Sequence, residues 1–144
     1  MAATAPSRPF VGEFIRRSYL IVSPQDRGAV ERAWSHNADA IVLDLHGVPN
    51  EQKRQVRPLI GEYLPLLSRG GAEAFVNMSR DYVWADAAAA VQPGVDGVIL
   101  THANSAEDVQ EADRAISEME KRNGVEENSV EIVVMSESSG EPRA

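Results

Sequence analysis

The sequence contains no cysteine, so it can form no disulfide bond, thiol nucleophile or thiolate metal site. Any bound metal must therefore use oxygen or imidazole ligands. Residues 1–9 hold two prolines and several small residues, without an apolar stretch long enough for a signal peptide or a membrane span. From these features we expect a soluble protein of a reducing compartment, the cytoplasm.

Basic residues are also scarce. The chain has 14 lysines and arginines against 22 acidic residues, which gives a formal net charge of −8. A field of this sign repels phosphate backbones and anionic lipid surfaces. We therefore expect neither nucleic acid nor a membrane as a partner.

Three common catalytic or nucleotide-binding motifs are missing as well. The sequence has no Walker loop, no glycine-rich dinucleotide fingerprint and no Gly-x-Ser-x-Gly nucleophile elbow. These absences argue against a P-loop nucleotidase, a Rossmann-type oxidoreductase and an α/β-hydrolase.

The rest of the composition is typical of a globular domain, with 43% hydrophobic and 25% charged residues. A chain of 144 residues can bury about two thirds of its unfolded surface, which suits a single domain. We assign that domain to residues 17–140, with a flexible arm at residues 1–16 and a tail at residues 141–144.

Short apolar runs alternate with segments in which apolar residues recur at helical spacing. The expected strands are Ser18–Val22, Ala38–Leu45, Ala72–Met78, Val95–Leu100 and Val130–Met135. The expected helices are Asp26–His36, Asn50–Leu67, Val83–Val91 and Ser105–Arg122. Asn50 and Ser105 are placed to cap their helices, whereas Pro58 and Pro65 are placed to kink or divide the second one.

Strands that alternate with helices pair in parallel through right-handed crossovers. Two α/β architectures satisfy this pattern: a partial (β/α)8 barrel of the TIM type with about five strands, or an open doubly wound sheet. A full barrel usually takes roughly 250 residues. Periodicity alone does not distinguish the two.

In both architectures, ligands bind beyond the carboxyl ends of the strands. The candidate site residues at these positions are Gln25, Asp26, Arg27, Asp44, His46, Asn77, Ser79, His102 and Glu137. Because imidazole titrates near neutral pH, His46 could carry a proton or bind a metal; the alternative is a structural hydrogen bond.

Several of these segments together resemble a known family. The chain is similar, in order and spacing, to the front half of HpcH/HpaI aldolases and citrate lyase β subunits. The similar stretches are Arg17–Val22, Ala38–Leu45, Lys53 with Arg57, Gly94–Leu100, Ser105–Val109 and Ser136–Ser138. The resemblance covers about residues 17–140 and implies a barrel that lacks three of its eight strands.

The resemblance also implies a carbon–carbon lyase or aldolase. Proteins of this family cleave or form carbon–carbon bonds in oxo acids or acyl-coenzyme A thioesters, with a magnesium-type ion polarising the carbonyl. Glu137 matches the metal-binding glutamate that follows strand five in the family. The second metal carboxylate of the family lies beyond the part of the barrel that this chain matches.

Other positions depart from the family pattern. Asp44 matches the aspartate that ends the second strand, but His46 and Gly47 replace the acidic pair that follows it. The substrate-binding arginine of strand three falls at Val76 or Asn77, and neither side chain can clamp a carboxylate with two hydrogen bonds.

Two further positions match the family only loosely. Arg27 meets the substrate-binding arginine after strand one only with a shift, and His102 stands where a lysine is common. We nevertheless expect a site made of these and the preceding residues. The expected catalytic residues are Asp44, His46 and His102, and the expected substrate-binding residues are Arg27, Asn77 and Ser79.

Three functional interpretations stay open. The chain is a divergent lyase whose missing strands come from another chain, or a non-catalytic remnant or accessory binding module, or an independent open-sheet domain. Half a barrel exposes two edge strands and an apolar inner face, both of which favour association. We therefore expect a homo-oligomer or a complex with a complementary chain.

Overall fold

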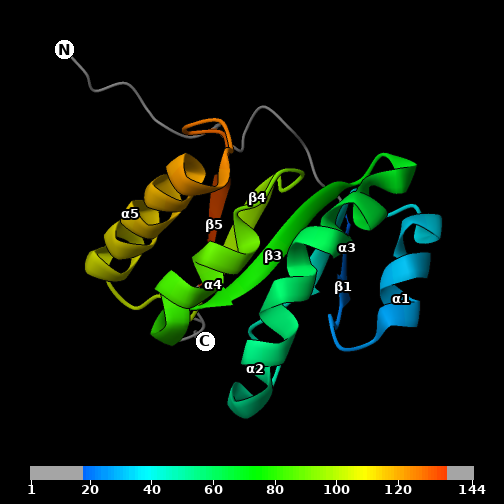
Figure 1. The fold of residues 1–144 in the computed structure, drawn as a ribbon, viewed down its shortest axis with the longest axis horizontal. Helices are drawn as coiled ribbons and strands as arrows, with labels where there is room; N and C mark the ends of the chain where they lie inside the picture. Colours follow the sequence, from blue (N-terminus) through cyan, green and yellow to red (C-terminus); the bar gives the residue numbers. More distant parts are fainter. Residues whose placement is uncertain (1–17, 136–144) are drawn as a thin grey trace, which may run out of the picture.

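The structure is a computed structural model that describes residues 18–135. Five parallel strands form one sheet in the order β1-β2-β3-β4-β5 (Figure 1). The strands are β1 (Tyr19–Val22), β2 (Ala40–Asp44), β3 (Glu73–Ser79), β4 (Gly97–Thr101) and β5 (Glu131–Met135). All five expected strands are therefore present, and no boundary differs by more than two residues.

Helical segments connect each strand to the next. The α-helices are α1 (Arg27–Arg32), α2 (Asn50–Val56), α3 (Ile60–Leu67), α4 (Val83–Ala90) and α5 (Ala106–Asn123). Short 3-10 turns are η2 (Ala33–His36), η3 (Arg57–Leu59), η4 (Ser68–Gly70) and η5 (Arg80–Tyr82). None of the helices within residues 18–135 combines the length and the apolar character needed to cross a membrane.

Proline explains why one expected helix becomes two. Residues 50–67 divide at η3, which contains Pro58, so that α2 ends at Val56 and α3 begins at Ile60. The ring of Pro58 removes a backbone donor and crowds the preceding turn. Pro65 lies inside α3, which continues past it to Leu67.

Of the two predicted N-terminal helix caps, one is confirmed and the other is wrong. Ser105 caps α5 as expected, because its Oγ accepts the backbone N–H of Asp108 at 3.3 Å. The expectation that Asn50 caps α2 is wrong: Asn50 is the first helical residue, and Pro49 precedes it without a side-chain cap bond. At the far end of α5, Gly124 adopts the left-handed conformation (φ 74°) that stops the helix.

The helices cover one face of the sheet, where the main core lies. Side chains alternate along each strand, so half of them point toward the helices. Leu43, Val76 and Leu100 of the strands pack with Leu64 of α3 and Ile116 of α5, and all five are fully buried. This layer joins the α/β units into one body.

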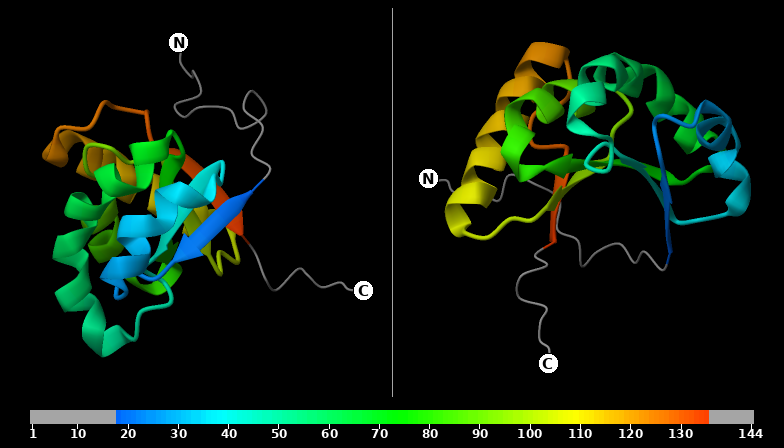
Figure 2. Two further views of the ribbon diagram at one scale, coloured as in Figure 1. Left: turned by 90° about the vertical axis from the view of Figure 1, so that its right-hand side faces the viewer. Right: turned by 90° about the horizontal axis from the view of Figure 1, so that it is seen from below.

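The opposite face of the sheet is concave and apolar. The right-hand view of Figure 2 shows the helices together on one side of the curved sheet. On the concave side, Val42, Phe75 and Ile99 form a second, smaller cluster. Beside it lies a hollow of about 280 Å³, lined by Tyr19, Ile21, Val42, Ile99, Val133 and Met135.

This topology confirms the expected α/β class. The five strands follow chain order, without the reversal that defines a doubly wound sheet. The described sheet is not closed, and β1 and β5 form its two edges. Consecutive order, curvature and helices on the convex face are consistent with a partial barrel.

Candidate active site

Polar side chains gather where β2, β3 and β4 end. They surround a pocket of about 360 Å³, which we call the mouth pocket. Its lining residues are His46, Asn50, Ser79, Arg80, Asp81, Tyr82, His102 and Asn104. Three of the residues expected from the sequence, His46, Ser79 and His102, therefore meet at one place.

The ring of His46 is held in a defined position. Its backbone N–H donates to the carbonyl oxygen of Asn77 at 2.9 Å. Its ring Nδ1 lies 2.8 Å from Oγ of Ser79 at the end of β3. With Nδ1 engaged in this way, Nε2 is the ring nitrogen that can exchange a proton with a ligand in the mouth pocket.

A second imidazole lies next to the first. The ring centroids of His46 and His102 are 5.1 Å apart, with the ring planes tilted by 54°. His102 has a positive φ of 68°, which is uncommon for a residue other than glycine and is concentrated at functional sites. Its backbone N–H donates to the carbonyl oxygen of Met135 on β5, which fixes this turn.

A row of polar side chains crosses the concave face beside the mouth pocket. Asn77 Nδ2 donates to Oδ1 of Asp44 at 3.0 Å, and Thr101 Oγ1 donates to Oδ1 of Asn77 at 2.5 Å. Gly47 also contacts this row, since its backbone N–H donates to the same Asp44 oxygen at 3.2 Å. Asp44 and Asn77, both expected site residues, are thus linked to each other.

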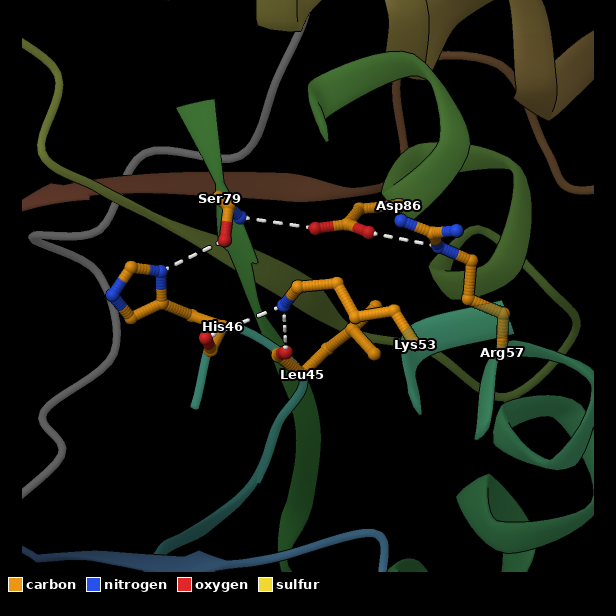
Figure 3. A network of polar contacts seen from close by, with 6 residues as sticks. All are labelled: Leu45, His46, Lys53, Arg57, Ser79 and Asp86. Atoms are coloured by element: carbon orange, nitrogen blue, oxygen red, sulfur yellow. Dashed lines mark hydrogen bonds and ion pairs between the residues drawn. The ribbon is translucent and has the colours of Figure 1, made fainter. Parts of the chain in front are cut away.

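Lys53 is a buried cation that contacts the backbone at His46. It is only 2% exposed, and its Nζ donates to the carbonyl oxygens of Leu45 at 2.5 Å and His46 at 3.3 Å (Figure 3). Burial lowers the pKa of the Lys53 amine, and the charge of Asp86 partly opposes this shift. Lys53 therefore braces the backbone that carries His46.

A buried ion pair supports the other side of the site. Arg57 Nε lies 3.0 Å from Oδ1 of Asp86, whose side chain is fully buried. The second oxygen of Asp86 accepts the backbone N–H of Ser79 at 3.1 Å (Figure 3). The two contacts connect the helix layer to the residue that touches His46.

Arg27, which the sequence places after the first strand, belongs to a different environment. Its guanidinium pairs with Glu62 at 2.8 Å and Glu31 at 3.0 Å on the helical surface. The hydrogen bond to Glu62, followed by that to Glu31, raises the pKa of Arg27. Arg27 does not line the mouth pocket.

Magnesium needs several oxygen ligands, which the described residues do not bring together. Within residues 18–135, no group of three or more His, Cys, Asp or Glu side chains is placed to hold a metal ion. The acid of the polar row, Asp44, already accepts two hydrogen bonds on Oδ1. A magnesium site would therefore need ligands beyond these side chains, and Glu137, the expected ligand, lies outside the described residues.

Three residues of this region, Lys53, Asp86 and Arg80, were not identified as site residues from the sequence. Lys53 lies on the apolar face of α2, three residues before Val56, and Asp86 is the one acid in the alanine-rich helix α4. A charged residue in an apolar stripe signals a buried pair. Arg80 directly follows β3 and satisfies the same positional rule that selects Ser79.

Comparisons with known proteins identify the family of this chain. A family model described as HpcH/HpaI aldolase/citrate lyase matches residues 17–140. The chain belongs to the HpcH/HpaI aldolase/citrate lyase family. The citrate lyase subunit beta of Haemophilus influenzae is 30% identical to it over 128 residues.

The relationship to this relative is partial in length. The aligned residues make up 86% of this chain but 44% of the Haemophilus influenzae protein. This HpcH/HpaI family chain therefore spans less than half the length of the curated relative that it matches. Its five described strands form an open arc, consistent with the front part of a barrel.

Proposed function

We propose that this chain carries part of the active site of a carbon–carbon lyase or aldolase that acts on an oxo acid or an acyl-coenzyme A thioester. The family match over residues 17–140 supports this class of reaction. The observation that carries the proposal is the position of His46. Its imidazole stands in the mouth pocket beside Ser79 and His102, at the carboxyl ends of adjacent parallel strands.

His46 is proposed as the proton-transfer group. In the cleavage direction, a base removes the hydroxyl proton of a hydroxy acid, and that oxygen becomes a carbonyl as the adjacent carbon–carbon bond breaks. The departing carbon keeps the electron pair as an enolate, which then takes up a proton. Nε2 of His46 is the atom proposed to accept and return the proton, while Ser79 holds Nδ1 at 2.8 Å.

His102 and Asp44 are proposed to support this chemistry from either side. His102, 5.1 Å from His46 between ring centroids, can donate a hydrogen bond to an oxygen on which charge develops. Asp44 orients Asn77, whose amide bridges to Thr101. These hydrogen bonds hold the three polar side chains in fixed positions beside the mouth pocket.

We further propose a magnesium-type ion with Glu137 as one ligand, on the strength of the family resemblance. Such an ion would polarise the carbonyl of the substrate when bound. Calorimetric titration of the full chain with magnesium chloride tests this, with Glu137→Gln as the variant. Equal heats for the two proteins would contradict the assignment of Glu137.

The central experiment is a cleavage and condensation screen with oxo acids, hydroxy acids and acyl-coenzyme A thioesters in the presence of magnesium. It uses the full chain, whose mass in solution is first measured by light scattering. We expect His46→Gln to lower turnover by about 10²- to 10⁴-fold, the usual contribution of a general base. His36→Gln, an exposed histidine in η2, is the matched control. If no substrate is turned over, the proposal fails.

A binding module without turnover is the second candidate. Asn77 favours it, because a neutral amide already bonded to Asp44 and Thr101 stands at one of the two positions, Val76 or Asn77, where the family resemblance expects a substrate-binding arginine. This candidate predicts saturable binding of an oxo acid with no product over long incubation. Detectable turnover that depends on His46 would exclude it.

A further inference from the structure

Among the described residues, Arg80 is the one lysine or arginine whose side chain lines the mouth pocket. It lies in the turn η5, directly after β3, and no other lysine or arginine within residues 18–135 lines that pocket. The two neighbouring cationic side chains already have hydrogen-bond or ion-pair partners. Lys53 is buried against two carbonyl oxygens, and Arg57 pairs with the buried carboxylate of Asp86.

Asn77, three residues before Arg80, cannot anchor an anion. Asn77 uses its amide nitrogen on Asp44 and its amide oxygen on Thr101, so both ends of its side chain are bonded. Asp44 also places a negative charge on that side of the pocket. A carboxylate ligand is therefore better accommodated on the η5 side.

Arg80 already holds a carboxylate in the structure. Its Nε and Nη2 both donate to Oδ1 of Asp81, at 3.2 and 3.1 Å, and its Nη1 lies 3.7 Å from Oδ2 of Asp108. Asp81 is strongly exposed, with 71% of its side chain accessible, whereas Arg80 is 36% exposed. A guanidinium has five donors, and these contacts leave some of them for a further acceptor.

We infer that Arg80 anchors the carboxylate of the oxo-acid substrate, with Asp81 occupying the guanidinium when no substrate is bound. This inference rests on the proposed function and deepens it, because it selects substrates with a free carboxylate. The planar fork of arginine matches two carboxylate oxygens, which a lysine does not.

The ligand pair for the test is pyruvate and methyl pyruvate, which differ in whether the carboxylate is free. Binding to the full chain is followed by amide chemical shifts in two-dimensional NMR, without added metal. We expect the wild-type protein to bind pyruvate more tightly than methyl pyruvate, with shifts at residues of the mouth pocket. No pyruvate binding, or equal binding of the two ligands, overturns the inference.

The variants separate an anchor from a general charge effect. We expect Arg80→Gln to weaken pyruvate binding by about 10- to 100-fold, as for the loss of a charged hydrogen bond, and to abolish the preference over the ester. Arg80→Lys retains the charge and should recover only part of the affinity. Arg122→Gln, an exposed arginine paired with Glu118 on α5, is the control and should leave binding unchanged.

Asp81 gives a prediction of opposite sign. Asp81→Asn removes the internal competitor and should strengthen pyruvate binding by up to about fivefold, the range of an exposed ion pair. A structural role for the Arg80–Asp81 pair would instead weaken binding in this variant. Weaker or unchanged binding in Asp81→Asn contradicts the competitor role, and unchanged binding in Arg80→Gln overturns the anchor.

These results are independent of turnover. If the lyase screen finds no product but pyruvate binding depends on Arg80, the proposed reaction fails and the anchor stands. If turnover is found and Arg80→Gln leaves KM for the oxo acid unchanged, the anchor fails and the reaction stands. The same spectra of each variant show whether it is folded.

Discussion

Arg57 Nε lies 3.0 Å from Oδ1 of Asp86, and the other oxygen of that fully buried carboxylate accepts the amide of Ser79. The pair thus links η3 and α4 to the end of β3, next to the residue that contacts His46. Breaking this pair should lower the free energy of unfolding far more than breaking a surface ion pair, because a buried carboxylate without its cation is costly.

Replacing Arg57 by alanine leaves Asp86 buried without its ion-pair partner, with the Ser79 amide still donating to it. We expect Arg57→Ala to lower the free energy of unfolding by about 3–5 kcal/mol, measured by urea denaturation. Arg122→Ala removes an exposed pair with Glu118 and should cost less than about 1 kcal/mol. Similar losses in the two variants would show that Asp86 finds another partner or becomes hydrated.

Lys53 gives the fold a dependence on alkaline pH. Burial lowers the pKa of its amine from the ordinary value of 10.5, so the folded chain releases this proton before the unfolded chain does. Between the lowered pKa and 10.5 the unfolded state binds more protons, and the contribution of Lys53 to stability therefore rises with pH. The penalty of a buried ammonium is fully present below the lowered pKa.

The measurement compares wild type with Lys53→Met in urea denaturation at several pH values from neutral to about 10. The difference in unfolding free energy should move in favour of wild type as the pH rises. All other titratable groups are present in both proteins, so their effects cancel in the difference. Parallel pH profiles would mean that Lys53 is no more buried when charged than in the unfolded chain.

Gly47 is required by the position of the Asp44 carboxylate. A Cβ added at Gly47 would overlap Oδ2 of Asp44, whereas one added at Gly61 in α3 would meet its nearest atom, on Gln92, at 3.6 Å. We expect Gly47→Ala to destabilise the fold by about 1–3 kcal/mol, through displacement of Asp44 and its bonds to Asn77. Gly61→Ala should stabilise it by up to about 1 kcal/mol, because alanine favours a helix interior.

Both glycine variants are measured by the same urea denaturation. Opposite signs are expected from one chemical change at two positions, which separates the local clash from a general effect of alanine. The shift of the Asn77 side-chain amide signals in NMR gives a second readout at the polar row. Unchanged signals in Gly47→Ala would show that Asp44 does not move.

The order and type of the elements could be predicted from the sequence, because burial on both faces leaves a clear pattern. Residues Ala40–Leu43 are continuously apolar and fully buried, as expected for a central parallel strand. The division of the second helix followed from Pro58. The cap of α2 could not be placed in the same way, since Pro49 sets the entry of the chain into the helix.

Side-chain partners were harder to predict than positions. The carboxyl-end rule identified His46, Ser79 and His102, which line one pocket. It did not show that Ser79 depends on Asp86, because that bond requires α4 to pack beside β3. The neighbours of Arg27 are likewise set by the packing of α1 on α3, which brings Glu62 within reach.

The concave face predicts association in solution. Ile21 and Met135 are 61% and 49% exposed on this face, next to the hollow that they line together with Val133. Such contiguous apolar surface favours binding to another surface, and β1 and β5 are the edges of the described sheet, where a further strand could pair. We expect light scattering to give a mass above that of the monomer, with a dependence on concentration.

Ile21→Gln tests which face is responsible. Removal of one apolar side chain from a buried contact should weaken self-association by about tenfold or more, seen as a shift of the transition to higher protein concentration. Trp84→Gln removes an exposed apolar side chain from the helical face and is the matched control. A larger effect of Trp84→Gln would place the contact on the convex side, and a concentration-independent monomer would contradict association through either face.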